Sequence, residues 1–223
     1  DYSGKFDIMD NFGGNKVIVY ARNACYDIAR SLGLDYFFEY EDDYTYFLFR
    51  YPNGDQLGSK KITNLDDVFL AMIECLDKTK VETIALAQGG DYIGGVGSFN
   101  VLNYKRKSMN SFVFKVNKNP SDDLMFIGRM NDDVNTYLSR GKVGSLFFQV
   151  ADACLLQKQT QSNQGGNTEA HKDFGTYVKS FYSVMAEPSC CAISVIGTSH
   201  SRIHHKINWT YAVPKIIRQE HKK

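Results

Sequence analysis

The sequence predicts an α/β protein, with a mixed central sheet flanked by helices and a single domain over residues 1–223. Short apolar segments of strand length alternate with segments whose apolar residues recur at helical spacing. With 223 residues, 43% of them hydrophobic, the chain can bury one sizeable core. No internal repeat interrupts this alternation. A layered α/β domain is therefore the simplest interpretation.

The first predicted unit is strand, helix, strand. Lys16–Tyr20 is a short apolar run, a helix ending at Gly33 follows, and Leu34–Tyr40 is a second apolar strand. The helix is expected to bury one stripe, made of Ala21, Ala24, Cys25, Ile28, Ala29 and Leu32. The unit ends at the adjacent acids Glu41, Asp42 and Asp43, beyond the carboxyl end of the second strand.

A second helix is expected to start at Asn64, whose side chain can cap it. Its inward face comprises Leu65, Val68, Phe69, Met72 and Leu76. Glu82–Ala87 then predicts a strand that ends in a glycine-rich turn, and the alternation of Phe112, Phe114 and Val116 predicts another.

The last third predicts a helix from Asn131 through Leu138, ending near Gly141, and then a strand over Gly144–Val150. Gln157–Thr168 has no large apolar side chain and is expected to be an exposed loop, the best candidate for a mobile lid. A helix over Gly175–Ala186, with Val178, Phe181, Tyr182 and Met185 inward, and a strand over Cys190–Ile196 complete the expected elements.

Charge and cysteine content limit the possible function classes. A net charge of +1 gives no general attraction to polyanions, so nucleic-acid binding has to come from local patches. Five cysteines form an odd number without C-x-x-C spacing, which favours a reduced cytosolic protein and argues against structural zinc. No apolar stretch approaches the roughly 18 residues that span a bilayer, so no membrane partner is expected.

Glu41 and Asp43 are candidate ligands of a hard cation, Mn²⁺ or Mg²⁺. Two carboxylates one residue apart can point toward one cation, which would neutralise a departing diphosphate. An acidic turn after a strand explains the same spacing. His204 or His205 could add one imidazole ligand, but not both, because neighbouring side chains in a strand point in different directions.

Asp132 and Asp133 form a second acidic pair. A carboxylate at a helix start can act as a general base toward a hydroxyl, although acids in the first turn also stabilise a helix by themselves. Lys105, Arg106 and Lys107 follow Tyr104 and, with Tyr44, combine cations and aromatics as nucleic-acid surfaces do. With fourteen tyrosines in the chain, such mixtures also arise by chance.

Several segments together resemble a known family. Ala21-Arg22-Asn23, a helix and a strand closing on Glu41-Asp42-Asp43 resemble the corresponding segment of GT-A glycosyltransferases. Four later segments resemble phage TET-associated glycosyltransferases: Gly128–Tyr137, Gly165–Glu169, Gly175–Phe181 and Arg202–His205.

The resemblance implies a GT-A-like fold and transfer of a hexose from a nucleotide-sugar, UDP-linked, to 5-hydroxymethylcytosine in double-stranded phage DNA. A TET-like dioxygenase supplies the hydroxyl in that family, and the host cytoplasm is the implied location. Glu41, Asp43 and His204 or His205 would match the metal site, and Asp133 or Asp132 the catalytic base. The donor site would comprise Arg22, Asn23, Asp42, Gly165, Gly166 and Arg202.

Direct displacement by Asp133 would invert the anomeric centre, and retention remains an alternative. Residues 1–100 are expected to form the donor and metal half, and residues 101–223 the acceptor half with a basic tail. Only twenty residues precede Ala21, so the strand and loop that hold the base in GT-A enzymes are expected to be missing or different. A transferase for glycans or small molecules, and a non-catalytic DNA-binding module, are the alternative functions. No obligate protein partner is indicated.

Overall fold

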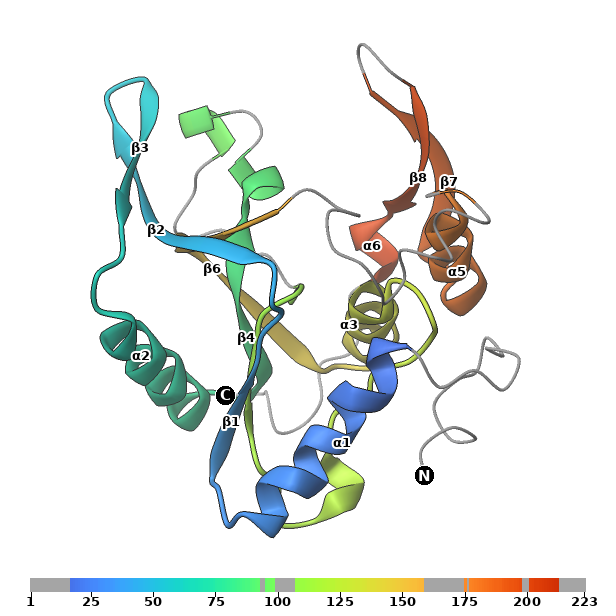
Figure 1. Ribbon diagram of the computed structural model, residues 1–223. Coiled ribbons are helices and arrows are strands. Elements are labelled where there is room, and N and C mark those ends of the chain that lie inside the picture. Colours follow the sequence, from blue (N-terminus) through green and yellow to red (C-terminus); the bar gives the residue numbers. More distant parts are fainter. Residues whose placement is uncertain are drawn as a thin grey trace. The chain divides into compact units, whose positions relative to one another are not determined.

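Figure 1 shows the computed structural model, which describes residues 17–92, 95–98, 107–158, 175, 177–197 and 201–212. The chain divides into two compact units that interleave along the sequence. The sheet unit comprises Leu34–Val116 and Leu146–Ser162, and the helical unit comprises Asp1–Gly33, Asn117–Ser145 and Asn163–Lys223. The expected division into donor and acceptor halves concerns function and stays a prediction.

A six-stranded mixed sheet forms most of the sheet unit. Its strands are β1 (Tyr36–Glu39), β2 (Tyr44–Asn53), β3 (Gln56–Lys61), β4 (Val81–Gln88), β5 (Phe112–Lys115) and β6 (Leu146–Gln157). The order is β1-β5-β4-β6-β2-β3, and β4 and β6 are parallel whereas the other neighbours are antiparallel. The predicted α/β class with a mixed, GT-A-like sheet is confirmed.

Helix α2 (Leu65–Lys78) packs on this sheet through the predicted face. Met72 and Leu76 are buried against Ile84 and Val113, because their four-residue spacing aligns them on one side of the helix. Asn64 stands at the N-cap position, but its side chain donates to Asp67 Oδ2 at 2.7 Å instead of capping a backbone group.

The β2–β3 hairpin lies at one edge of the sheet and was not predicted as a pair of strands. The two strands pair from Leu48↔Lys61 to Asn53↔Gln56 and turn at Gly54-Asp55, where Gly54 has φ +59. Glycine at the first turn position favours a two-residue hairpin, because glycine adopts positive φ without a Cβ clash. Figure 1 shows the hairpin projecting beyond α2.

Four helices and one hairpin make up most of the described part of the helical unit. They are α1 (Ile18–Ser31), α3 (Asp132–Lys142), α5 (Val178–Ala186), α6 (Trp209–Ala212), β7 (Cys191–Ile196) and β8 (Arg202–Ile207). Helix α5 packs on both strands of the β7–β8 hairpin, and α3 packs on α5 and α6. A short 3₁₀ turn, η3 (Pro120–Asp122), lies in the segment before α3.

The predicted strand at Lys16–Tyr20 is wrong, because residues 18–20 are the first residues of α1 and Lys16 lies outside the described residues. The β-branched run favours a strand locally, but helical packing of Val19 overrides that preference. The expected apolar stripe is also wrong. Ile28 and Leu32 are 54% and 66% exposed, whereas Val19, Arg22, Asn23, Tyr26 and Ala29 are buried. Gly33, with φ +67, ends the helix as predicted.

The predicted inward face of α5 is wrong as well. Phe181 and Met185 are 43% and 66% exposed, and the buried side chains are those of Ser180 and Ser183. Strand β8 was not predicted, since its basic residues hide the period-two pattern. The predicted lid lies outside the described residues beyond Lys158, and Gln157 itself is the last residue of β6.

Within the described ranges, no helix combines the length and the apolar character that crossing a membrane requires.

Candidate active site

The buried acids at the start of α3 form the centre of the candidate site. Asn131 precedes them in the left-handed region (φ 53, ψ 36), which turns the chain sharply into the helix. Asp132 and Asp133 are 5% and 7% exposed, in the first helical turn, where carboxylates interact favourably with the helix dipole. Local helix chemistry therefore explains their position but not their burial.

Arg22 of α1 pairs with the first of these acids. Its Nη1 lies 2.5 Å from Asp132 Oδ2, and the two side chains are 6% and 7% exposed. The guanidinium also lies over the ring of Phe126, 5.2 Å from its centroid. Asn23 holds the segment that contains Phe126, because its side-chain amide donates to Phe126 O at 3.0 Å and accepts from Phe126 N at 2.8 Å. Arg22 and Asn23 thus join α1 to the segment before α3.

Asp133 is the titratable group with the clearest functional signature. Burial, together with the neighbouring charge of Asp132, raises the pKa of Asp133 from its ordinary value of 3.8 to about 6, although Arg22 opposes the shift. Asp133 Oδ1 accepts from Val134 N at 2.7 Å. A carboxyl group that titrates near pH 6 can take a proton at neutral pH, which is the property of a general base.

Three elements meet at the side chain of Asn131. Its amide nitrogen donates to Lys179 O at 2.9 Å and to Ser183 Oγ at 3.0 Å, both on α5. It also lies 3.4 Å from Nδ1 of His205 on β8. Asn131 therefore connects the N-terminus of α3 to α5 and the hairpin.

Besides Arg22, the cation that acts on Asp133 is Lys179 of α5, which itself lies near Arg202 of β8. Burial lowers the pKa of Lys179, with Arg202 acting in the same direction and Asp133 opposing it. Burial, followed by the neighbouring His204 and Lys179, lowers the pKa of His205 to about 4, so its imidazole is neutral at pH 7. Because Arg202 is exposed at the start of β8, its guanidinium is accessible to an anionic ligand.

The histidine rings contradict one expectation. His204 and His205 do not point in different directions, since their ring centroids are 4.3 Å apart with an angle of 31° between the planes. Nδ1 of His204 lies 2.7 Å from His205 O, so it is assigned as the donor, and Nε2 is left as the nitrogen that could accept or ligate. Both candidate imidazoles lie in the helical unit.

The acids Glu41, Asp42 and Asp43 occupy the turn between β1 and β2 in the sheet unit. The carboxylates of Glu41 and Asp43 converge on one amide, Nε2 of Gln157, at 3.4 and 3.3 Å. Asp42 is exposed. The amide of Asn110 donates to the other end of Gln157 at 3.0 Å and orients it.

The oxygen atoms of Glu41 and Asp43 are of the kind that a hard divalent cation prefers. Within the described ranges, no group of three or more His, Cys, Asp and Glu is placed to hold a metal by itself. Mg²⁺ commonly uses only one or two carboxylates together with substrate phosphates. Glu41 and Asp43, which face the same point, can supply those two ligands.

Two of the expected nucleic-acid contacts have other roles in the structure. Lys107 Nζ lies 2.5 Å from Asp91 Oδ1, with side-chain exposures of 17% and 8%, so its charge is already paired. Tyr44 donates through its hydroxyl to Asn110 O and packs edge-on against Phe47, so its ring is not open for stacking. Lys105, Arg106, Gly165 and Gly166 lie outside the described residues.

Sequence reasoning missed Lys179, Asn131 and Gln157. A single lysine in a helix, an asparagine at a helix start and a glutamine at a strand end carry no signal of their own. Only the fold brings Lys179 close to Asp133, which is 46 positions away in the sequence. The same holds for Gln157 and Asp43, which are 114 positions apart.

The comparisons with known proteins identify the class. The sequence model of a glycosyltransferase family, described as TET-Associated Glycosyltransferase, matches residues 8–166. The match covers more than half of the chain, and the chain belongs to the TET-associated glycosyltransferase family. The resemblance inferred from the sequence is thereby confirmed. Helix α5 and the β7–β8 hairpin lie beyond the matched residues. The search of curated proteins and that of solved structures each gave no match.

Proposed function

We propose that the protein transfers a hexose from a nucleotide-sugar, UDP-linked, to the hydroxyl of 5-hydroxymethylcytosine in DNA. The observation that carries this proposal is the Asp133 carboxyl. It is buried and titrates near pH 6, beside the Arg22–Asp132 pair, in a chain that belongs to a glycosyltransferase family. Acceptor activation is the step of sugar transfer that requires such a group.

In the proposed reaction the Asp133 carboxylate accepts the proton of the hydroxymethyl group. The hydroxyl oxygen forms a bond to the anomeric carbon, and the bond from that carbon to the diphosphate oxygen breaks, so the diphosphate leaves with the electron pair. Displacement in one step inverts the anomeric centre. Asp132, paired with Arg22, lies next to Asp133, and this neighbouring charge helps to raise the pKa of Asp133 and so makes it a stronger base.

A divalent cation, Mn²⁺ or Mg²⁺, would bind at Glu41 and Asp43 and neutralise the charge of the diphosphate. The convergence of the two carboxylates on Gln157 supports this assignment. Among the described residues of the helical unit, Arg202 is well suited to bind a phosphate, because it is exposed and a guanidinium can form two parallel hydrogen bonds.

One surface of the β2–β3 hairpin supports a DNA acceptor. Phe49 and Tyr51 alternate on the same face of β2 and are 41% and 45% exposed. Lys60 pairs with Phe49 across the hairpin and is exposed. The ring of Tyr51 lies over Gly58, where an added Cβ would be 2.6 Å from the ring. A rigid aromatic pair next to an ammonium suits contact with bases and phosphates.

The test of the proposed function is a transfer assay with two matched duplexes, one containing 5-hydroxymethylcytosine and one containing cytosine. Several UDP-sugars are supplied with Mn²⁺ or with a chelator. The DNA is then digested, and the masses of the released nucleosides are measured by mass spectrometry. We expect one added sugar on the hydroxymethylated duplex only, and its loss with the chelator. Transfer to glycans alone, or DNA binding without any turnover of donor, would contradict the proposal and favour a different transferase or a binding module.

The hairpin makes a separate prediction about DNA affinity. Replacing Phe49 and Tyr51 together by Ala is expected to weaken DNA binding about tenfold or more, because base–aromatic stacking contributes roughly 1–3 kcal/mol per base. Lys60→Gln is expected to make the plot of log K against log[salt] less steep, by about the amount that one phosphate contact contributes to its slope. Fluorescence anisotropy at several salt concentrations measures both effects. Leu70→Ala is the control, since Leu70 is 62% exposed on α2, and an equal loss there would refute a specific role of the hairpin.

A further inference from the structure

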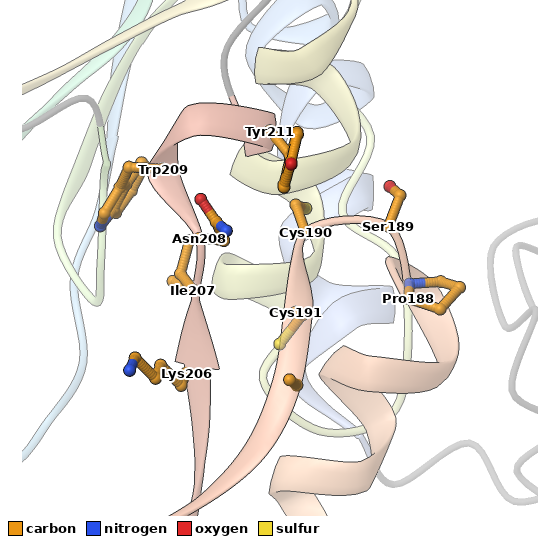
Figure 2. Close-up of a pocket in the computed structure, with 10 residues that line it drawn as sticks. Pro188, Ser189, Cys190, Cys191, Lys206, Ile207, Asn208, Trp209 and Tyr211 are labelled. Atoms are coloured by element: carbon orange, nitrogen blue, oxygen red, sulfur yellow. The ribbon is translucent and has the colours of Figure 1, made fainter.

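A cavity of about 560 Å³ opens at the base of the β7–β8 hairpin, where α6 begins (Figure 2). Two aromatic residues line it, Trp209 and Tyr211, which are 41% and 58% exposed. Asn208 and Lys206 supply polar groups to the lining, and Cys190, which is 2% exposed, supplies an apolar one. The volume is in the range of small-molecule sites, and the mixture of planar apolar groups with a few polar ones is typical of them.

The ring of Tyr137 supports the ring of Trp209. The two rings stack with centroids 6.0 Å apart and an angle of 12° between the planes. Tyr137 belongs to α3 and is only 3% exposed, so it is a fixed support. An indole that is immobilised on one side and exposed elsewhere is a preformed stacking surface for a planar ring.

Asn208 supplies the polar group of the cavity. Its Oδ1 accepts from Thr210 N at 3.1 Å, which leaves the amide N–H groups as donors without a partner among the residues that the structure covers. Figure 2 shows Trp209 and Tyr211 on either side of Asn208 at the same end of the hairpin. A ring that stacks here therefore meets hydrogen-bond donors, which suit the carbonyl oxygen of a pyrimidine and, in a cytosine, the ring nitrogen beside it.

The cavity is connected to the candidate base through α3. Tyr137 follows Asp133 by four residues, so the two side chains lie on the same face of the helix, one turn apart. Trp209 stacks on Tyr137 and so contacts α3 one turn beyond the carboxyl that would receive the proton.

We propose that this cavity binds a pyrimidine base, which stacks on Trp209, accepts hydrogen bonds from Asn208 and has its phosphate near Lys206. The base is that of the nucleic-acid acceptor, unpaired or turned out of the duplex. This inference rests on the proposed function, because the acceptor base follows from it. The uracil of the donor offers a planar ring with carbonyl acceptors as well, and the experiment separates the two sources.

The chain has one tryptophan, so its tryptophan fluorescence reports on Trp209 alone. A short single-stranded oligonucleotide with one 5-hydroxymethylcytosine is titrated into the protein, beside an oligonucleotide that is abasic at that position, and beside UDP. We expect saturable quenching by the first and at least about fivefold weaker binding of the abasic one. Quenching by UDP alone would support a pyrimidine site but assign it to the donor. Equal binding of the abasic strand, or no quenching by either nucleotide, would overturn the site.

Asn208→Ala and Tyr211→Ala keep the fluorescent residue and are each expected to weaken binding about fivefold or more. Tyr177→Ala is the matched control, because Tyr177 is 49% exposed on the same unit and does not line the cavity. Binding is measured without turnover, so base-dependent quenching would persist even if no sugar were transferred. Unchanged affinity in both variants, with normal transfer, would remove the site and leave the proposed function intact.

Discussion

Replacing Asp133 by Asn is expected to lower kcat/KM for sugar transfer by about 10²–10⁴-fold, the usual contribution of a general base. Asn has the same shape and can still accept from Val134 N, so the loss reports on proton transfer and not on packing. In the unsubstituted protein, kcat/KM should rise with pH through about 6 and then level, because only the ionised carboxyl accepts a proton. A pH profile that is flat between 5 and 8 would exclude Asp133 from this role.

The same substitution is expected to stabilise the fold at neutral pH. The folded pKa of Asp133 is about 6 and its ordinary value is 3.8, so folding favours the protonated form. The stabilisation that the raised pKa implies is fully present below pH 3.8 and is lost as the pH rises through about 6. Asn imitates the protonated form, so the free energy of unfolding should increase by about 1–3 kcal/mol at pH 7 and little at pH 4.

Urea unfolding of both proteins at the two pH values measures this difference. Asp122→Asn is the control, because Asp122 is an exposed acid in η3 of the same unit and should change stability little at either pH. A variant that is inactive and less stable at pH 7 would mean that the Asp133 carboxylate holds the structure together. Activity lost together with stability gained is the pattern of a group retained for function.

The second large effect is expected at Arg22. Arg22→Ala leaves the buried Asp132 without its cation, and removal of one partner of a buried pair typically costs about 3–5 kcal/mol. The lower free energy of unfolding should be measurable by urea unfolding at pH 7. The substitution should also raise the pKa of Asp133 further, since Arg22 normally lowers it, and so shift the pH profile of any residual activity upward.

A double substitution separates the charge from the packing. Arg22→Met together with Asp132→Leu removes both charges and should recover much of the stability but not the activity. Lys78→Ala, which breaks an exposed ion pair with Glu74 on α2, should change stability little. If Arg22→Ala is as mild as Lys78→Ala, the Arg22–Asp132 pair is not what joins α1 to α3.

Patterns of short range predicted most of the fold. The face of α2, the strands around Ile84 and Phe114 and the stop at Gly33 follow from spacing and turn chemistry that a single segment carries. The buried face of α1 could not be predicted in this way, because Arg22 and Asn23 are buried by partners 110 and 103 residues away. A residue's hydropathy does not reveal such partners.

The candidate site shows the same division. Asp133 was found because acids in a first helical turn are visible in the sequence, and its burial was not. Lys179 and Asn131 were missed because their meeting depends on how α5 and β8 pack against α3. The alternation of Phe49 and Tyr51 was visible, but their exposure depends on a hairpin that projects beyond α2.

Helix α1 buries two polar residues and exposes two large apolar side chains near its C-terminus, and this affects how the chain can be altered. Ile28 and Leu32 face outward, so their replacement by polar residues should improve behaviour in solution at little structural cost. Arg22 and Asn23 tolerate no such freedom. A redesign guided by hydropathy alone would replace Arg22 and Asn23, which join the helix to the rest of its unit. It would keep Ile28 and Leu32, which can be replaced.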